Sequence, residues 1–199
     1  MNPGQALSAG FSDPVQAAQA AFRSALQALS RPGTRVELGS PLQGVQLGGA
    51  MAHLLLTLTD EDTPVWWQQT DPTAPTWLRF HTGAPQAATS QAAAFAVVTQ
   101  ASTLPVLDHF VVGSAAAPEF SCTVLVEVPA LDGGTPVLWQ GPGIHVPLTV
   151  GVSGLPSGFW SQWQANHDLF PQGVDILFCC GNTALGLPRT TRVQSMEGG

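Results

Sequence analysis

Four polar residues with the capacity for chemistry lie in or beside candidate strands: Arg79, His81, Asp175 and Arg189. A buried charge needs a partner, because desolvation of an isolated ion is strongly unfavourable. One interpretation is therefore structural, an internal Arg–Asp ion pair that locks a sheet. The other is functional, a contact with an anion, a nucleotide or another subunit. The sequence leaves both open, and it indicates no catalytic, cofactor-binding or metal-binding residue.

The remaining reactive side chains lack the spacing of a known site. The histidines stand far apart and no Cys-x-x-Cys occurs, so we expect no zinc site. The acidic run 60–62 could hold Mg²⁺, although a solvated loop is the favoured interpretation. Residues 141–143, Gly-Pro-Gly, lack the lysine and the longer glycine pattern of a phosphate-binding loop. We expect Cys122, Cys179 and Cys180 to be reduced thiols buried in strands.

The composition excludes several classes of protein. The chain has 199 residues, no lysine and a net charge of −7. Binding to nucleic acid normally needs clustered Lys and Arg, so we expect no nucleic-acid partner. A Walker A loop and a pyridoxal-phosphate enzyme each need a lysine, so we expect no cofactor. Charged residues make up 10% of the chain, against about 25% in typical domains, and so sparse a charge favours surfaces that meet partners.

Length and terminal sequence suggest one domain over residues 1–199, with residues 1–11 frayed. The N-terminus has no basic segment followed by an apolar core. No apolar run approaches the ~20 residues of a membrane span. The three cysteines are an odd number without a disulfide framework. We therefore expect a cytoplasmic protein that does not enter a membrane.

The stretch 168–192 is the segment around which the rest is organised. A turn at 171–173 precedes the apolar run 174–180, which only Asp175 interrupts. The pair Gly181-Asn182 breaks that run before a second apolar run at 184–187. This pattern predicts two strands joined by a tight turn. Because the first run is otherwise apolar, we expect it to be buried on both faces beneath helices.

Periodicity places the other elements around this hairpin. It predicts helices at residues 14–31, 50–59 and 156–166. It predicts strands at residues 34–38, 63–67, 77–81, 92–99, 121–128 and 137–140. The strand 77–81 would carry Arg79 and His81 on one face. The sequence thus predicts an α/β fold, a three-layer mixed β-sheet covered by helices.

Two sets of apolar side chains bear on association. The first helix has an apolar face that packs on the domain or on a partner, formed by Val15, Ala18, Phe22, Leu26 and Leu29. The adjacent Trp66 and Trp67 should point to opposite faces of a strand, with one of them exposed. Together with Trp160 and Trp163 they are candidate interface anchors. We expect a homodimer when the chain is isolated.

Five segments, in order, resemble one known family. They are PVQAAQAAFRSALQALSRPG, LLTLTDEDTPVW, RFHTGAP, FPQGVDILFCCG and LPRTTRV. The chain resembles the PhnH family, whose members are subunits of the carbon–phosphorus lyase system that degrades phosphonates. The resemblance implies a reduced version of the large domain of pyridoxal-phosphate-dependent transferases that has lost its cofactor site. It also implies that the other carbon–phosphorus lyase subunits are partners.

Two hypotheses follow for function. The first is a non-catalytic or accessory subunit that supports synthesis of alpha-D-ribose 1-methylphosphonate 5-triphosphate from ATP and methylphosphonate, with catalysis on another subunit, as the resemblance implies. The second is a stand-alone protein or enzyme that binds a small anion or nucleotide through Arg79, His81 and Arg189. Turnover of ATP with methylphosphonate by the isolated chain would separate them.

Overall fold

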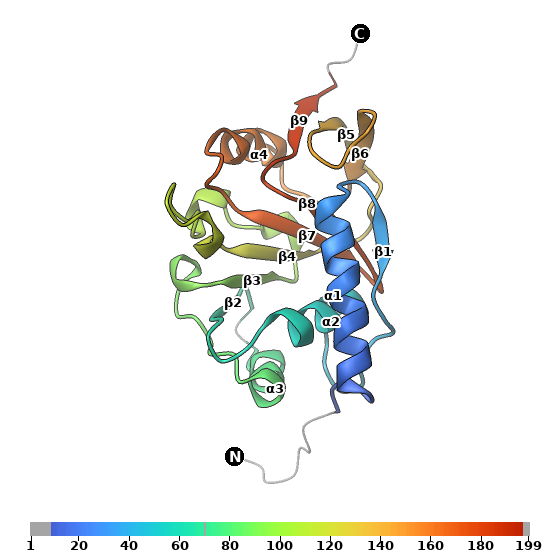
Figure 1. Ribbon diagram of the computed structural model, residues 1–199, viewed down its shortest axis with the longest axis vertical. Coiled ribbons are helices and arrows are strands. Elements are labelled where there is room, and N and C mark those ends of the chain that lie inside the picture. Colours follow the sequence, from blue (N-terminus) through green and yellow to red (C-terminus); the bar gives the residue numbers. More distant parts are fainter. Residues whose placement is uncertain (1–8, 70, 197–199) are drawn as a thin grey trace.

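A six-stranded mixed sheet forms the centre of the protein (Figure 1), in a computed structural model that describes residues 9–69 and 71–196. Its strand order is β1-β8-β7-β4-β3-β2. The strands are β1 (Arg35–Glu37), β2 (Val65–Trp67), β3 (Phe95–Val98), β4 (Thr123–Glu127), β7 (Asp175–Cys180) and β8 (Thr183–Leu187). β2, β3, β4 and β7 run parallel, whereas β8 is antiparallel to β7 and β1. The mixed α/β sheet predicted from the sequence is confirmed.

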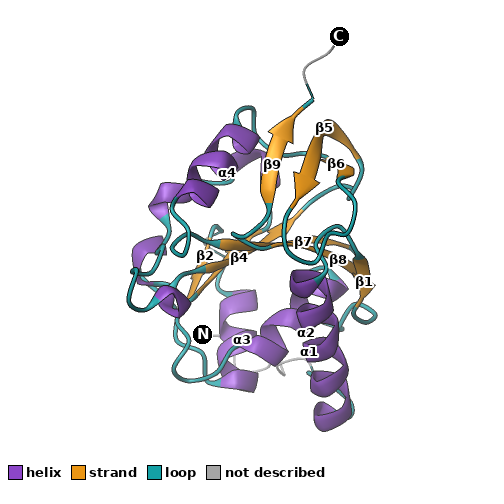
Figure 2. Cartoon of the chain, turned by 45° about the horizontal axis from the view of Figure 1, so that its top comes forward, coloured by secondary structure: helices purple, strands orange, loops and turns teal. Residues whose placement is uncertain are grey.

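The two faces of this sheet are covered differently (Figure 2). One face packs against α1 (Pro14–Ser30), α2 (Gly49–Leu58) and α3 (Thr73–Thr82). The other packs against α4 (Phe159–Asp168) and a second, antiparallel sheet of order β6-β5-β9. The strands of that sheet are β5 (Gly133–Gln140), β6 (Leu148–Val152) and β9 (Arg192–Ser195). Short 3₁₀ turns complete the chain, at Ser90–Ala92, Ala101–Thr103, Leu107–His109 and Pro118–Phe120.

The second sheet corrects the expectation that helices alone cover the central sheet. β6 alternates apolar and polar residues, but it is short and lies in a segment rich in Gly and Pro, whereas β9 has a single apolar residue, Val193, and follows a proline and two threonines. Each is held by pairing with β5 rather than by its own propensity. Three layers are present, but one outer layer is part helix and part sheet.

The predicted hairpin is confirmed as the middle of the sheet. Cys180 pairs with Thr183 across the two-residue turn, where Gly181 has a φ of +57°. Along β7 the side chains alternate between the two cores, and Ile176 to Cys179 are fully buried. A strand covered on both faces accounts for the continuous apolar run.

Helix α1 begins where the sequence predicts, but it packs through a different face. The Asp13 side chain accepts a hydrogen bond from the backbone N–H of Gln16 at 3.2 Å, as an N-cap should. The buried residues are alanines, namely Ala21, Ala25 and Ala28. Of the larger apolar side chains, Leu29 packs against the core, but three lie outside, where Val15 is 67% exposed, Phe22 47% and Leu26 52%. A Cβ on Gly186 of β8 would lie 2.4 Å from the Ala28 carbonyl oxygen, so only small residues fit between helix and sheet.

The predicted strand at 77–81 is wrong, because this segment belongs to α3. The helix begins after Asp71, whose carboxylate accepts from the Thr73 backbone N–H at 2.9 Å. It ends at Gly83, which has a φ of +80°. Trp77 and Leu78 are both buried although they are adjacent, which a strand with one covered face would not allow.

The expectation of an exposed tryptophan in β2 is also wrong. Trp67 is buried in one core, and Trp66 is partly buried in the other, with its ring 5.9 Å from that of Phe110. Because the sheet has a core on each face, side chains that point in opposite directions are both covered. Of the segment expected to fray, residues 1–8 lie outside the described residues, and the Phe11 ring lies 4.9 Å from that of His53.

Candidate functional site

Asp175 and Arg189 form an ion pair at the open end of the hairpin. Asp175 begins β7 and Arg189 follows β8, and the register that pairs Ile176 with Leu187 brings them together. The Arg189 Nη2 donates to Asp175 Oδ2 at 2.5 Å, and its Nε donates to Oδ1 at 3.1 Å. The Arg189 backbone N–H also donates to Oδ1, at 2.7 Å. The Arg189 side chain is only 13% exposed and that of Asp175 20%, so the predicted internal pair is present.

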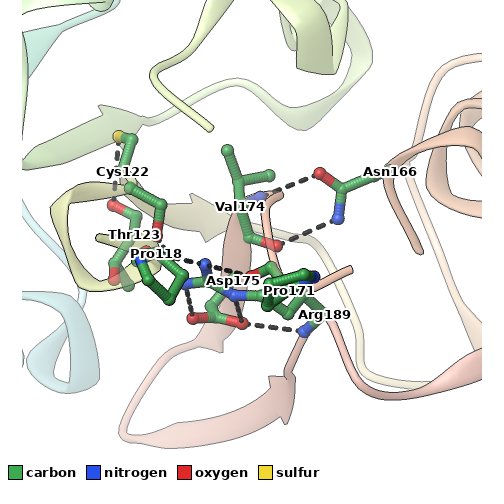
Figure 3. A network of polar contacts seen from close by, with 9 residues as sticks. Pro118, Cys122, Thr123, Asn166, Pro171, Val174, Asp175 and Arg189 are labelled. Carbon is green, nitrogen blue, oxygen red and sulfur yellow. Dashed lines mark hydrogen bonds and ion pairs between the residues drawn. The ribbon is translucent and has the colours of Figure 1, made fainter. Parts of the chain in front are cut away.

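The guanidinium of Arg189 has further partners on two other segments (Figure 3). Its Nη1 donates to the carbonyl oxygens of Pro118 at 3.0 Å and Pro171 at 3.4 Å. Its Nη2 also donates to Ser121 Oγ. A guanidinium has five N–H donors. These three contacts and the two with the Asp175 carboxylate account for all five. The group therefore has no donor left with which to bind an anion.

Helix α4 is fastened to the same region through its buried polar face. Asn166 donates to the Val174 carbonyl oxygen at 3.0 Å and accepts from the Val174 N–H at 2.8 Å (Figure 3). His167 Nδ1 lies 2.8 Å from the Arg189 carbonyl oxygen. Trp163 Nε1 donates to the Thr191 carbonyl oxygen at 2.9 Å. The cluster around Arg189 thus joins α4, the strand β7 and the segment that precedes β4.

Arg79 and His81 lie elsewhere. Both are in the last turn of α3, where Arg79 is exposed. The His81 ring makes edge contacts with Trp77, at 5.2 Å between ring centroids, and with Phe80, at 5.1 Å. In the sheet, β3 and β4 separate β7 from β2, the strand that precedes α3. The structure brings together Asp175 and Arg189, and it does not bring the other two candidates to them.

Pro118, Ser121 and Pro171 were not indicated by the sequence. Two of them act through backbone carbonyl oxygens, which every residue carries, so side-chain type gives no signal. Ser121 precedes β4, and a serine before a strand is ordinary. Asn166 is 4% exposed. The signal that could have identified Asn166 is its position on a helix that also carries tryptophans.

Cys122 and Cys179 are buried and have no nucleophilic character, whereas Cys180 is partly exposed, which corrects the expectation that all three thiols are buried. Burial raises the pKa of Cys122 to about 12. Burial, and then the charges of Glu127 and Cys180, raise the pKa of Cys179. In the described part of the chain no three His, Cys, Asp or Glu side chains are grouped to hold a metal ion. The acidic residues 60–62 form an exposed turn. None of the described helices is long and apolar enough to cross a membrane.

Glu127, at the end of β4, is the other partly buried carboxylate among the described residues. A Cβ on Gly48 would lie 2.6 Å from its Oε1, so the start of α2 approaches it closely. Burial raises the pKa of Glu127, and a hydrogen bond from the Gly48 backbone N–H opposes that rise. Its charge lies close enough to the buried thiol of Cys179 to raise the pKa of that thiol.

Comparison with known proteins identifies the family. Residues 9–194 match the family of the bacterial phosphonate metabolism protein PhnH. The chain is 38% identical to the alpha-D-ribose 1-methylphosphonate 5-triphosphate synthase subunit PhnH of Rhizobium meliloti (strain 1021), over 96% of each chain. It is 30% identical to a putative C-P lyase subunit protein, HtxG, of Stutzerimonas stutzeri, over 88% of this chain and 85% of the relative. The chain therefore belongs to the PhnH family of bacterial phosphonate metabolism proteins.

Proposed function

We propose that this protein is a non-catalytic, accessory subunit of the carbon–phosphorus lyase complex. In that role it supports synthesis of alpha-D-ribose 1-methylphosphonate 5-triphosphate from ATP and methylphosphonate, while another subunit carries the chemistry. The observation that carries the proposal is the close relationship to two proteins that are each named as subunits, one of that synthase and one of a C-P lyase.

The polar cluster around Arg189 supports an accessory role. A catalytic or anion-binding arginine keeps at least one donor for its ligand, whereas the five donors of Arg189 meet protein acceptors. The stand-alone alternative would therefore depend on Arg79 and His81 alone. We also propose that residues 1–199 form one cytoplasmic domain, and that its fold is a reduced transferase large domain without the cofactor site.

The exposed apolar stripe on α1, formed by Val15, Phe22 and Leu26, supports a homodimer of the isolated chain. These residues are spaced seven and four apart and so lie along one side of the helix. Arg23 is the only charged residue between Pro14 and Ser30, and the helix has no carboxylate. Two copies of this stripe could meet about a two-fold axis without repulsion between acidic groups.

The test is reconstitution. The isolated chain should show no turnover of ATP with methylphosphonate, and the other subunits of the same organism's complex should lose turnover when this chain is omitted. Arg79→Gln should leave the reconstituted activity unchanged. Turnover by the isolated chain that Arg79→Gln abolishes would establish the stand-alone alternative instead.

A further inference from the structure

A cavity of about 310 Å³ opens beside α4, between that helix and the 3₁₀ turn at Leu107–His109. In Figure 1 the yellow-green coil that contains this turn lies directly below α4. The lining is mostly apolar: Val106, Leu107, Asp108, Val112, Gln162, Ala165, Asn166 and Leu169. The volume is roughly twice that of an engineered cavity of about 150 Å³ that holds benzene. The cavity is therefore large enough to take an aromatic or branched side chain.

The mouth of the cavity is an exposed apolar surface. Val106 and Leu169 line the cavity and are also exposed, and Phe170 beside Leu169 is exposed as well. We call these three residues, with the cavity, the α4 patch. Two of the three polar side chains in the lining have partners within the protein, since Gln162 accepts from the Leu107 backbone N–H at 3.1 Å and Asn166 bonds to Val174, while Asp108 lies at the rim. A ligand would thus be recognised here by apolar contact.

The charge around the α4 patch is negative. Asp108 lines the cavity, and its side chain is 85% exposed. Asp168, which directly precedes Leu169, is also exposed. His109 lies 3.9 Å from Asp108, and the charge of Arg189 is neutralised by Asp175. A second copy docked here would bring an equally acidic rim against this one, which is unfavourable. A segment with an apolar anchor flanked by Lys or Arg would be complementary to it.

We propose that the α4 patch is the docking site for a basic, apolar segment of another subunit of the complex. An aromatic or branched side chain of that segment fills the cavity, and neighbouring Lys or Arg side chains pair with Asp108 and Asp168. This inference rests on the proposed function, because it takes its partner from there. It assigns separate surfaces to the two kinds of contact, α1 to a second copy and the α4 patch to the other subunit.

One substitution at two places tests the assignment. Leu169→Ser removes a 46% exposed leucine from the α4 patch, and Leu26→Ser removes a 52% exposed leucine from α1. Each full-length variant would be co-expressed with the other subunits of the same organism's complex, and affinity and mass would be measured on the purified proteins. We expect Leu169→Ser to weaken partner binding about tenfold or more, the loss that truncation of an interface anchor typically causes. Leu26→Ser should leave that affinity within about twofold of the parent, since Leu26 lies on α1 and outside the α4 patch.

Two further variants address the cavity and the charge. Ala165→Phe keeps the surface apolar but fills the cavity, and it should also weaken binding. Asp108→Asn should make partner binding less sensitive to salt, because one charge pair is lost. Circular dichroism and melting temperature would show that each variant is folded, and a variant that is not folded would be replaced by Val106→Ser at the same mouth.

The outcomes separate the inference from the proposed function. If the parent forms the complex and Leu169→Ser, Val106→Ser and Ala165→Phe bind as tightly as the parent, the α4 patch is not the docking site although the proposed function stands. If Leu169→Ser instead converts the isolated protein from a dimer to a monomer, as its mass in solution would show, a second copy occupies the patch and the assignment is wrong. If the parent does not bind the other subunits at all, the proposed function fails, and the partner assigned to this patch fails with it.

Discussion

Removing the carboxylate of Asp175 should cost the protein a large part of its stability. In Asp175→Ala the Arg189 guanidinium would lose two hydrogen bonds from its five donors, and the Arg189 backbone N–H would lose a third. Both side chains are at least four-fifths buried, so water could replace these bonds only in part. Breaking a buried pair in this way costs about 3–5 kcal/mol. For a chain of this length that corresponds to a melting temperature roughly 6–20 °C lower.

The measurement is urea unfolding followed by tryptophan fluorescence, with a matched exposed pair as the control. Arg35 donates to Asp132 at 2.9 Å, but these side chains are 51% and 71% exposed. Asp132→Ala should therefore cost about 0–1 kcal/mol. The double variant Asp175→Ala/Arg189→Met should cost less than the sum of the single changes, because the second removes the orphaned charge left by the first. Equal small losses for Asp175→Ala and Asp132→Ala would refute the buried-pair argument.

Three smaller expectations follow from other groups. Burial raises the pKa of Glu127 above its ordinary value of 4.5, so the free energy of unfolding should fall as pH rises from 4.5 through the raised pKa. Glu127→Gln should remove this pH-dependent loss and raise the melting temperature at pH 7. A lower melting temperature of Glu127→Gln at pH 7 would show that the charge is stabilising. Of the thiols, Cys180 is partly exposed while Cys122 and Cys179 are buried, so a thiol reagent at pH 8 should modify Cys180 alone in the folded protein, as tandem mass spectrometry of chymotryptic peptides would reveal. Because the chain has no lysine, the purified protein mixed with pyridoxal phosphate should show no aldimine absorbance that survives dialysis. Because no group of metal-binding side chains is present in the described part of the chain, elemental analysis should find no stoichiometric metal.

The hairpin and its ion pair could be predicted because they depend on strong local signals. The run from 174 to 180 is apolar except for one carboxylate, so the strand had to be buried and the carboxylate had to be paired. The turn at Gly181 separates two runs of strand length. The register that pairs Ile176 with Leu187 then brings Arg189, the nearest arginine beyond the second run, next to Asp175. Sequence spacing determines such a contact without knowledge of the rest of the fold.

Features that depend on distant packing could not be predicted. Periodicity correctly identified α1 but not which of its sides meets the sheet. That choice depends on the close approach of Gly186 to the Ala28 backbone, which admits only alanines at the contact. The short aromatic segment of α3 suits a strand by propensity, and its helical form depends on burial of Trp77 and Leu78 together. The carbonyl acceptors at Pro118 and Pro171 leave no trace in side-chain type.

The saturated guanidinium implies that Arg189 acts through the surfaces it holds in place. Its Nη1 joins the carbonyl of Pro118, before β4, to that of Pro171, which follows Leu169 and Phe170 of the α4 patch. Lysine has three donors on one atom and cannot reach all these acceptors in the same fork. Arg189→Lys should therefore loosen the chain after α4 and weaken partner binding at temperatures where the protein is still folded. Asp132→Ala should change neither property, and tight partner binding by folded Arg189→Lys would mean that the patch keeps its shape without the clamp.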